Sequence, residues 1–116
     1  MIILFTGHRD KLANEDEIDL IHCAYTDSIW MHGGAIGFDT QVNEFAKKHK
    51  IKTIICRPDY KKFGRAAPIF RNRAMVDTPD VQLVIALWDG RACGGTAFTV
   101  RYARQACKEV IVLRPL

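Results

Sequence analysis

Apolar residues along this chain gather in short continuous runs that are separated by stretches with a helical period. The clearest run covers residues 81–87, Val-Gln-Leu-Val-Ile-Ala-Leu, and it is bounded by Thr78-Pro79 and by Gly90. Runs of this length that are apolar at nearly every position are typical of strands covered on both faces. Five strands are predicted in this way, at residues 2–5, 28–31, 53–56, 81–87 and 110–113.

The segments between these runs carry apolar residues at the spacing i, i+3, i+4 and i+7, which places them on one face of a helix. Val42, Phe45 and Ala46 show this spacing most clearly. Asn14, with Glu17 three residues later, has the composition of a helix N-terminus. Four helices are predicted: from Asn14 to about Tyr25, from Thr40 to about His49, from Pro68 to Val76, and from the turn Gly94-Gly95-Thr96 to about Cys107.

Strands that alternate with helices through short connections predict a parallel sheet with helices on both faces. The 116 residues contain no linker, repeat or low-complexity segment, so one α/β domain is expected over residues 1–116. We predict a single doubly wound parallel sheet of about five strands in the order 3-2-1-4-5. In such sheets a ligand lies beyond the carboxyl ends of the strands where the winding direction reverses, here between the first and fourth strands.

Composition narrows the functional classes only a little. Net charge is +4, which suits an anionic ligand, but no block of like charge indicates a nucleic-acid binder. The four cysteines stand far apart without metal-ligand or disulfide-framework spacing, so reduced thiols and a cytoplasmic protein are expected, with no metal site and no cofactor. No apolar run approaches the ~18 residues of a membrane span, and the N-terminus opens on a strand without a leader.

A glycine-rich turn, Gly33-Gly34-Ala35-Ile36-Gly37, joins the second predicted strand to the second helix. Such a turn presents backbone N–H groups and the positive end of a helix dipole to an anion, and phosphate is the usual guest. The spacing is neither a dinucleotide fingerprint nor a P-loop. A purely structural turn, with Asp39 as N-cap of the helix, explains the same residues. The sequence leaves both interpretations open.

A second turn of this kind, Gly94-Gly95-Thr96, opens the last helix. Two such turns on neighbouring strand ends favour a phosphate site more than either turn alone. Thr96 is expected to cap its helix and could also contact the ligand through its hydroxyl. The predicted ligand-binding residues are Thr6, Gly7, His8, Arg9, Gly33, Gly34, Gly37, Asp39, Arg71, Asn72, Trp88, Gly94, Gly95 and Thr96.

Other side chains near the predicted pocket carry more specific expectations. Arg9, Arg71 and Arg73 are candidates for charge-assisted contacts to phosphate, and His8 and His32 stand at strand ends. Trp88, with Phe63 or Tyr60, could stack on a base or could close the core. No pair of carboxylates is recognisable, so no catalytic residue is assigned.

These motifs together resemble the SLOG superfamily, a Rossmann-like group that includes the DNA-processing protein A family and the LOG-type phosphoribohydrolases. The resemblance is strongest to its small, single-domain YspA-like branch, formerly a domain of unknown function numbered DUF2493. The matching segments are Thr6-Gly7-His8-Arg9, Gly33-Gly34-Ala35-x-Gly37-x-Asp39, Arg71-Asn72-x-x-Met75 and Gly94-Gly95-Thr96. The resemblance implies a pocket for a nucleotide or a nucleotide-derived ligand.

The resemblance also implies, for some branches, hydrolysis of the N-glycosidic bond of a nucleoside monophosphate. LOG-type hydrolases carry a glutamate just after the second Gly-Thr, whereas Ala97, Phe98, Thr99 and Val100 follow Thr96 here. Because such cleavage normally needs a carboxyl group, binding or sensing of a small nucleotide is the leading hypothesis.

Two alternatives remain at this point. The first is a phosphoribohydrolase-type N-glycosidase with a rearranged carboxylate, most plausibly Asp39 or Asp89. The second is a single-stranded nucleic-acid binder. It would use a basic cluster formed by Lys61, Lys62, Arg65, Arg71 and Arg73. No membrane partner is expected, while a small α/β domain with one uncovered helical face often forms a homo-oligomer.

Overall fold

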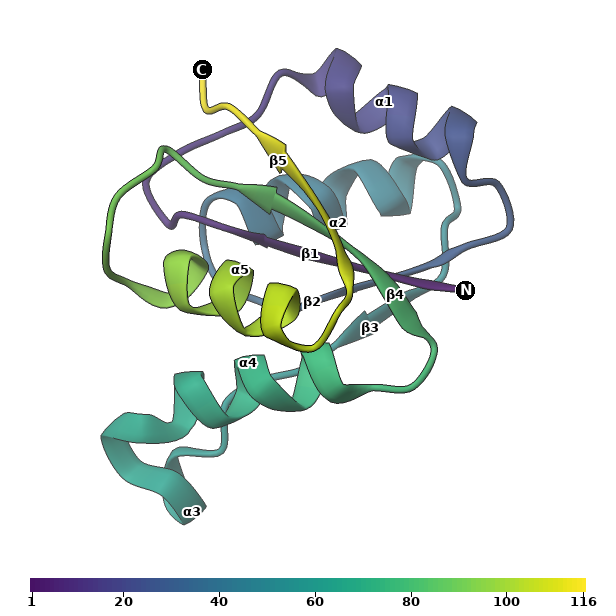
Figure 1. Ribbon diagram of the computed structural model, residues 1–116. Helices are drawn as coiled ribbons and strands as arrows, with labels where there is room; N and C mark the ends of the chain where they lie inside the picture. Colours follow the sequence, from purple (N-terminus) through teal and green to yellow (C-terminus); the bar gives the residue numbers. More distant parts are fainter.

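The computed structural model describes all residues 1–116 and contains one five-stranded parallel sheet (Figure 1). The strands are β1 (Ile2–Gly7), β2 (Ile29–His32), β3 (Thr53–Ile55), β4 (Val81–Leu87) and β5 (Glu109–Leu113). Their order is β3-β2-β1-β4-β5, and every neighbouring pair is parallel. The predicted fold, a doubly wound α/β sheet with the order 3-2-1-4-5, is therefore confirmed. The winding direction reverses between β1 and β4.

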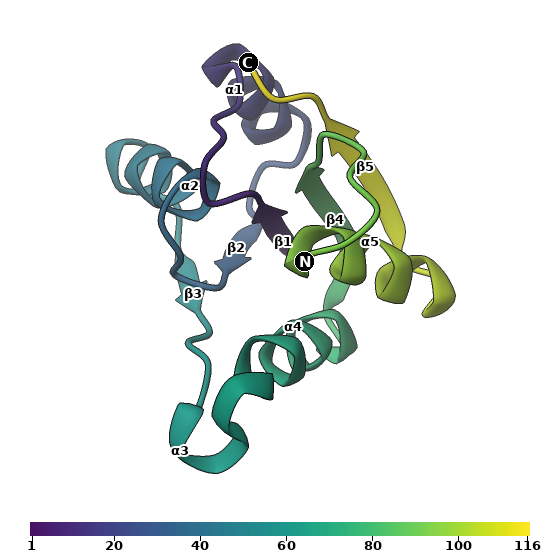
Figure 2. The ribbon, with the colours of Figure 1, turned by 90° about the vertical axis from the view of Figure 1, so that its left-hand side faces the viewer.

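Helices cover both faces of this sheet. They are α1 (Glu15–Ala24), α2 (Phe38–Lys48), α3 (Tyr60–Phe63), the 3-10 turn η1 (Gly64–Ala66), α4 (Ala67–Asp77) and α5 (Gly95–Gln105). Figure 2 shows α1 and α2 on one side of the sheet and α4 and α5 on the other. None of the helices has the length and apolar character that crossing a bilayer requires.

Strand β1 lies at the centre and supplies both halves of the core. Successive side chains of a strand point to opposite faces, so Ile3 and Phe5 pack with α1 and α2, whereas Ile2 and Leu4 pack with α4 and α5. All four side chains are buried. This explains why the run is apolar at every position rather than alternating.

Helix N-termini differ from the sequence prediction in two places. Asn14 caps α1 as expected, because its Oδ1 accepts from the N–H of Asp16 at 2.9 Å. Asp39, however, does not cap α2; Gly37 holds the N-cap position with φ 81°, and Asp39 lies inside the first turn. Thr96 likewise is not the cap of α5, which begins after Gly94 with φ 105°. Both residues are thereby released for other contacts.

Candidate functional site

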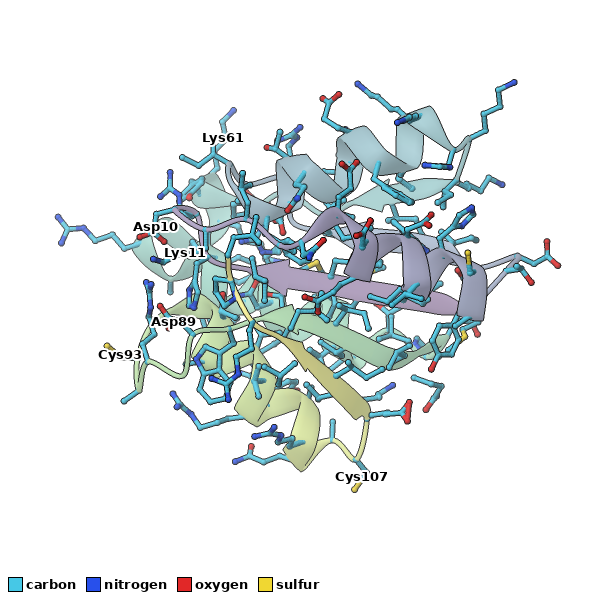
Figure 3. The ribbon with its side chains drawn as sticks, turned by 90° about the horizontal axis from the view of Figure 1, so that it is seen from above. Asp10, Lys11, Lys61, Asp89, Cys93 and Cys107 are labelled. Carbon is cyan, nitrogen blue, oxygen red and sulfur yellow. The ribbon has the colours of Figure 1, made fainter.

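The carboxyl ends of β1 and β4 open on a cleft of about 560 Å³. The cleft lies where the winding direction reverses, which is the position expected of a ligand site in this architecture. Figure 3 shows Asp10, Asp89 and Cys93 at this end of the sheet, and Cys107 at the other end. The predicted residues that line the cleft are Thr6, Gly7, His8, Arg9, Gly33, Asp39, Arg71, Asn72, Gly94, Gly95 and Thr96.

Three predicted residues lie outside the lining of the cleft: Gly34, Gly37 and Trp88. Gly34 borders a separate small cavity behind the first glycine turn. Gly37 allows a close backbone approach, since a Cβ there would lie 2.4 Å from the carbonyl oxygen of Arg9. Trp88 donates its indole N–H to the carbonyl of Arg91 at 3.0 Å, which fixes the β4–α5 loop. These three residues shape the loops and do not line the cleft.

The first glycine turn is occupied by a carboxylate of the protein itself. Asp39 Oδ2 accepts from the N–H of Gly33 at 3.1 Å and from the N–H of Ala35 at 3.2 Å. The N–H between them, that of Gly34, donates to His32 Nδ1 at 3.0 Å. Three successive donors of the turn are therefore used internally, and the prediction that this turn offers its N–H groups to a phosphate does not hold in this structure.

His32 completes this arrangement from behind the turn. Because Nδ1 accepts from Gly34, the proton of the neutral ring is on Nε2, which donates to Asn43 Oδ1 at 3.1 Å. The side chain is buried and lines the small cavity, not the cleft. Both nitrogens of His32 are therefore satisfied within the protein, and this strand-end histidine does not reach the cleft.

Arg71 fastens helix α4 to the ends of β2 and β3. Its Nη1 donates to the carbonyls of Gly33 at 2.8 Å and Cys56 at 3.2 Å, and its Nε donates to Asn72 Oδ1 at 2.7 Å. A Cβ on Gly33 would lie 2.3 Å from Nη1, so a side chain there would displace the guanidinium. Only Nη2 of the guanidinium has no acceptor in the protein, so Arg71 serves mainly to position the loops.

Burial shifts the pKa values of Asp39 and Arg71 in opposite directions. Burial raises the pKa of Asp39, although the N–H groups of Ala35 and Gly33 and the positive charge of Arg71 oppose the shift. Burial lowers the pKa of Arg71, and the negative charge of Asp39 opposes this change. The carboxyl of Asp39 lines the cleft, and its Oδ1 accepts no hydrogen bond from the protein.

The second glycine turn is open. A Cβ on Gly94 would meet nothing within 4 Å, and one on Gly95 would meet only Asn72 Nδ2 at 3.5 Å. The first hydrogen bond of helix α5 runs from Phe98 N–H to Gly94, so the N–H groups of Gly95, Thr96 and Ala97 have no acceptor. Gly95 and Thr96 line the cleft, so their N–H groups and the positive end of the α5 dipole provide what an anion site requires.

Three buried polar side chains that line the same cleft each have a polar atom with no hydrogen-bond partner in the protein. Thr6, Asn72 and Thr96 are 8%, 6% and 5% exposed, and all three line the cleft. The hydroxyls of Thr6 and Thr96 and the Nδ2 of Asn72 make no hydrogen bond within the protein. Since no fully enclosed side-chain polar atom lacks a partner, these atoms are open to the cleft. Hydrogen-bonding groups left in this state are typical of a ligand site.

The rim of the cleft is a network of charges that joins the ends of β1 and β4. His8 Nε2 accepts from the N–H of Asp89 at 3.2 Å, and Asp89 in turn holds Arg91 through both carboxylate oxygens. Arg91 also lies 3.7 Å from Asp10. The hydrogen bonds from Arg91 lower the pKa of Asp89, while burial and then the charge of Arg91 lower the pKa of His8.

Arg91 and Asp10 line the cleft, yet neither was among the predicted site residues. Their charges compensate one another across two loops that are far apart in sequence. The spacing of Asp89 and Arg91, two residues apart before a glycine turn, was the one local signal that could have indicated this network. Arg9, which was predicted, lines the cleft without a carboxylate partner.

No aromatic side chain forms a wall of the cleft, contrary to the suggestion that Trp88, Phe63 or Tyr60 stacks on a base. Phe63 stacks on Phe70 with 4.3 Å between ring centroids. Tyr60 is exposed on the short helix α3. Phe5 borders the cleft but is fully buried, and its ring packs on Trp30 at 4.5 Å on the α1–α2 side of the sheet.

One of the five residues of the basic cluster suggested for nucleic-acid binding is turned inward, and the other four are exposed. Arg71 points inward to the carbonyls of Gly33 and Cys56. The guanidinium of Arg73 lies over the ring of Tyr102 on helix α5, at 5.6 Å. Lys61, Lys62 and Arg65 remain exposed on α3 and η1, and Lys62 lies 5.2 Å from the ring of Phe63. No group of three His, Cys, Asp or Glu side chains is placed to hold a metal ion.

Comparison with known families identifies the first half of the chain. The YAcAr family, described as the YspA, cpYpsA-related SLOG family, matches residues 1–63. This match spans β1 to α3 and includes the segments Thr6–Arg9 and Gly33–Asp39. No curated protein and no solved structure shows significant similarity to the chain. The resemblance to the SLOG superfamily is thereby confirmed, and the chain belongs to the YspA, cpYpsA-related SLOG family.

Proposed function

We propose that this protein binds a nucleotide or a nucleotide-derived ligand whose phosphate lies at the N-terminus of α5. Membership of the SLOG family suggests a nucleotide-related function. The cleft at the β1–β4 reversal supports a phosphate position at the second glycine turn, Gly94-Gly95-Thr96, rather than at the first. This narrows the sequence-based hypothesis from two phosphate-binding turns to one.

One observation carries the proposal: free donors converge at the second turn. The N–H groups of Gly95, Thr96 and Ala97 have no acceptor, and the hydroxyl of Thr96 and the Nδ2 of Asn72 lie beside them, almost wholly buried. None of these side-chain donors is fully enclosed, so each can hydrogen-bond to a ligand that enters the cleft. A phosphate, with its oxygens all acceptors, would satisfy them together.

Charge also supports a phosphate in this position. Arg9 lines the cleft with no carboxylate beside it, and Nη2 of Arg71 has no protein acceptor. On the rim, the charge of Asp89 is neutralised by Arg91. The positive end of helix α5 adds to these charges, so the second turn is the part of the cleft most favourable to an anion.

The test is ligand-induced stabilisation of the protein by AMP, and the variant that should abolish it is Gly95→Asp. AMP at about 100 times its dissociation constant should add about 2.7 kcal/mol to the free energy of unfolding, which raises the melting temperature by several degrees. The Gly95→Asp carboxylate would lie among the free N–H groups and repel phosphate. Gly95 has no positive φ and room for a Cβ, so the variant should fold.

Gly95→Asn is the matched control, because it adds the same volume without the charge. It should bind AMP more weakly than the wild type but clearly more tightly than Gly95→Asp. Equal affinity in all three proteins would overturn the assignment of phosphate to the second turn. A melting temperature unaffected by AMP, GMP, NAD or ADP-ribose would overturn the nucleotide proposal as a whole.

A second candidate function, N-glycosidic hydrolysis, is favoured by a single observation. Asp39 is a carboxyl that lines the cleft, and burial raises its pKa, a property of general acids. The other carboxylate suggested from sequence, Asp89, is a poor acid because Arg91 lowers its pKa, and it does not line the cleft. Release of free base from a nucleoside monophosphate, lost in Asp39→Asn, would establish hydrolysis; no release by the wild type would exclude it for the compounds assayed.

A further inference from the structure

The part of the ligand that the cleft contacts can be inferred from what its walls contain. The wall around the second glycine turn consists of hydrogen-bond donors suited to phosphate. The apolar members of the lining are Phe5, Ala35, Pro68 and Met75. Phe5 and Met75 are almost completely buried, so little of either reaches the cleft. Ala35 and Pro68 are half-buried, so the apolar surface that the walls offer a base is aliphatic and not aromatic.

Four aromatic rings near this end of the molecule are held by contacts within the protein. Phe63 and Phe70 stack on each other, and the ring of Phe5 packs beneath the sheet on Trp30. Trp88 is fixed by its indole N–H to Arg91. Proteins that grip a base usually stack it on an aromatic face, a contact typically equivalent to about 5-fold to 100-fold in affinity. This cleft has no such platform.

The opposite wall of the cleft carries an acceptor suited to a sugar hydroxyl. Asp39 uses Oδ2 to hold the N–H groups of Gly33 and Ala35, while Oδ1 receives no hydrogen bond from the protein. The side chain is 6% exposed and lines the cleft. Because no fully enclosed side-chain polar atom lacks a partner, Oδ1 is open to the cleft. A carboxylate oxygen is a hydrogen-bond acceptor and can receive the proton of a sugar hydroxyl.

We propose that the cleft recognises the ribose phosphate of its ligand, with Thr96 and Asn72 at the phosphate and Asp39 at a ribose hydroxyl, and leaves the base in solvent. This inference rests on the proposed nucleotide-binding function and specifies its ligand class. The protein then binds ribonucleoside 5′-monophosphates with little regard to the base. Ribose 5-phosphate alone is sufficient for binding.

The test is a set of dissociation constants measured by calorimetry for AMP, GMP, CMP, UMP, ribose 5-phosphate, adenosine and inorganic phosphate. The four nucleotides should agree within about 3-fold and ribose 5-phosphate should bind within about 10-fold of them, because no stacking contact is lost. Adenosine, which lacks the phosphate, should bind at least about 30-fold more weakly than AMP.

Opposite results separate failure of this inference from failure of the proposed function. A preference of more than about 10-fold for one base, or binding of AMP without binding of ribose 5-phosphate, would overturn base-independent recognition and leave nucleotide binding intact. Binding of none of the phosphorylated compounds would overturn both proposals. Adenosine binding as tightly as AMP would show that the phosphate contributes nothing to the affinity.

Two variants test which wall meets the sugar. Asp39→Asn can retain an oxygen toward Gly33 and Ala35 while presenting an amide N–H₂ to the cleft, so ribose 5-phosphate should bind about 10-fold more weakly whereas inorganic phosphate should not. Tyr60→Ala, on the exposed helix α3, should leave every dissociation constant unchanged. Equal losses for ribose 5-phosphate and inorganic phosphate in Asp39→Asn would show that Asp39 only shapes the loop and would overturn the assigned sugar contact.

Discussion

The two glycine turns of this protein both join a strand to a helix, but their N–H groups differ in whether they have an acceptor within the protein. In the first, the N–H groups of Gly33 and Ala35 donate to Asp39, and that of Gly34 donates to His32. In the second, the N–H groups that follow Gly94 have no acceptor in the protein. The first turn is closed on the protein's own carboxylate, and the second is open to the cleft.

This difference shows that glycines in a strand-to-helix turn can serve close packing or ligand access. At Gly33 and Gly37, a Cβ would collide with Arg71 and with the backbone of Arg9, so these glycines admit protein atoms. At Gly94 the same construction meets empty space. What surrounds the missing Cβ, rather than the glycine itself, indicates which turn can receive a phosphate.

The largest loss of stability should come from adding a side chain in the closed first turn. Gly37→Ala adds a Cβ 2.4 Å from a backbone oxygen at a position with φ 81°, and we expect a loss of about 3 kcal/mol or more in the free energy of unfolding. Gly90→Ala is the control, since its φ is 89° but its surroundings are open; about 1 kcal/mol of backbone strain is expected there. Urea denaturation measures both, and equal losses would mean that the close approach to Arg9 contributes nothing.

A smaller loss is expected when the acceptor of the closed turn is removed. Asp39→Ala leaves the N–H groups of Gly33 and Ala35 without a partner. The free energy of unfolding should fall by about 2–3 kcal/mol. Asp39→Asn keeps an oxygen in reach of these donors and should lose about 1 kcal/mol. If Asp39→Ala unfolds at the same urea concentration as the wild type, the turn does not depend on its carboxylate.

The open turn should respond in affinity and hardly in stability. Thr96→Val replaces the unpartnered hydroxyl by a methyl group of similar size, so AMP should bind about 5-fold to 10-fold more weakly. The free energy of unfolding should change by no more than about 0.5 kcal/mol. Thr96→Ser keeps the hydroxyl and should bind AMP nearly as the wild type does. A large loss of stability in Thr96→Val, with unchanged affinity, would reverse the contrast between the turns.

The smallest effect concerns the rim, which holds the open turn against β1. Burial and the charge of Arg91 lower the pKa of His8, so the unfolded chain takes up a proton at this residue before the folded protein does. The stability that neutral His8 contributes is complete above about pH 6.5 and is lost as the pH falls toward the lower folded pKa.

The measurement is the urea midpoint of the wild type and of His8→Gln at pH 7.5 and at pH 5.5. The wild type should lose more stability between these values than the variant does. His22→Gln, which removes a histidine outside the cleft, is the matched control. A pH dependence identical in wild type and His8→Gln would show that the bond between Asp89 N–H and His8 does not depend on the neutral ring.

The architecture could be predicted from sequence because each strand and helix has its own hydrophobic pattern and its own boundary residues. The apolar run at residues 81–87 became β4 with unchanged bounds, and Pro68 lies in the first turn of α4 as expected. The prediction that the loops after β1 and β4 meet at a cleft followed from the strand order, since parallel strands place their carboxyl ends at one edge. Eleven of the fourteen predicted site residues line that cleft.

The sequence by itself determined the sheet, its order and the two glycine turns, because hydrophobic period and turn residues act over short distances along the chain. Only the tertiary structure decided which turn is open. Closure of the first turn depends on Asp39 reaching back from inside α2 and on Arg71 arriving from α4, 38 residues away from Gly33. The direction of a side chain and the arrival of a distant guanidinium are set by packing across the sheet, and no local pattern in the sequence encodes them.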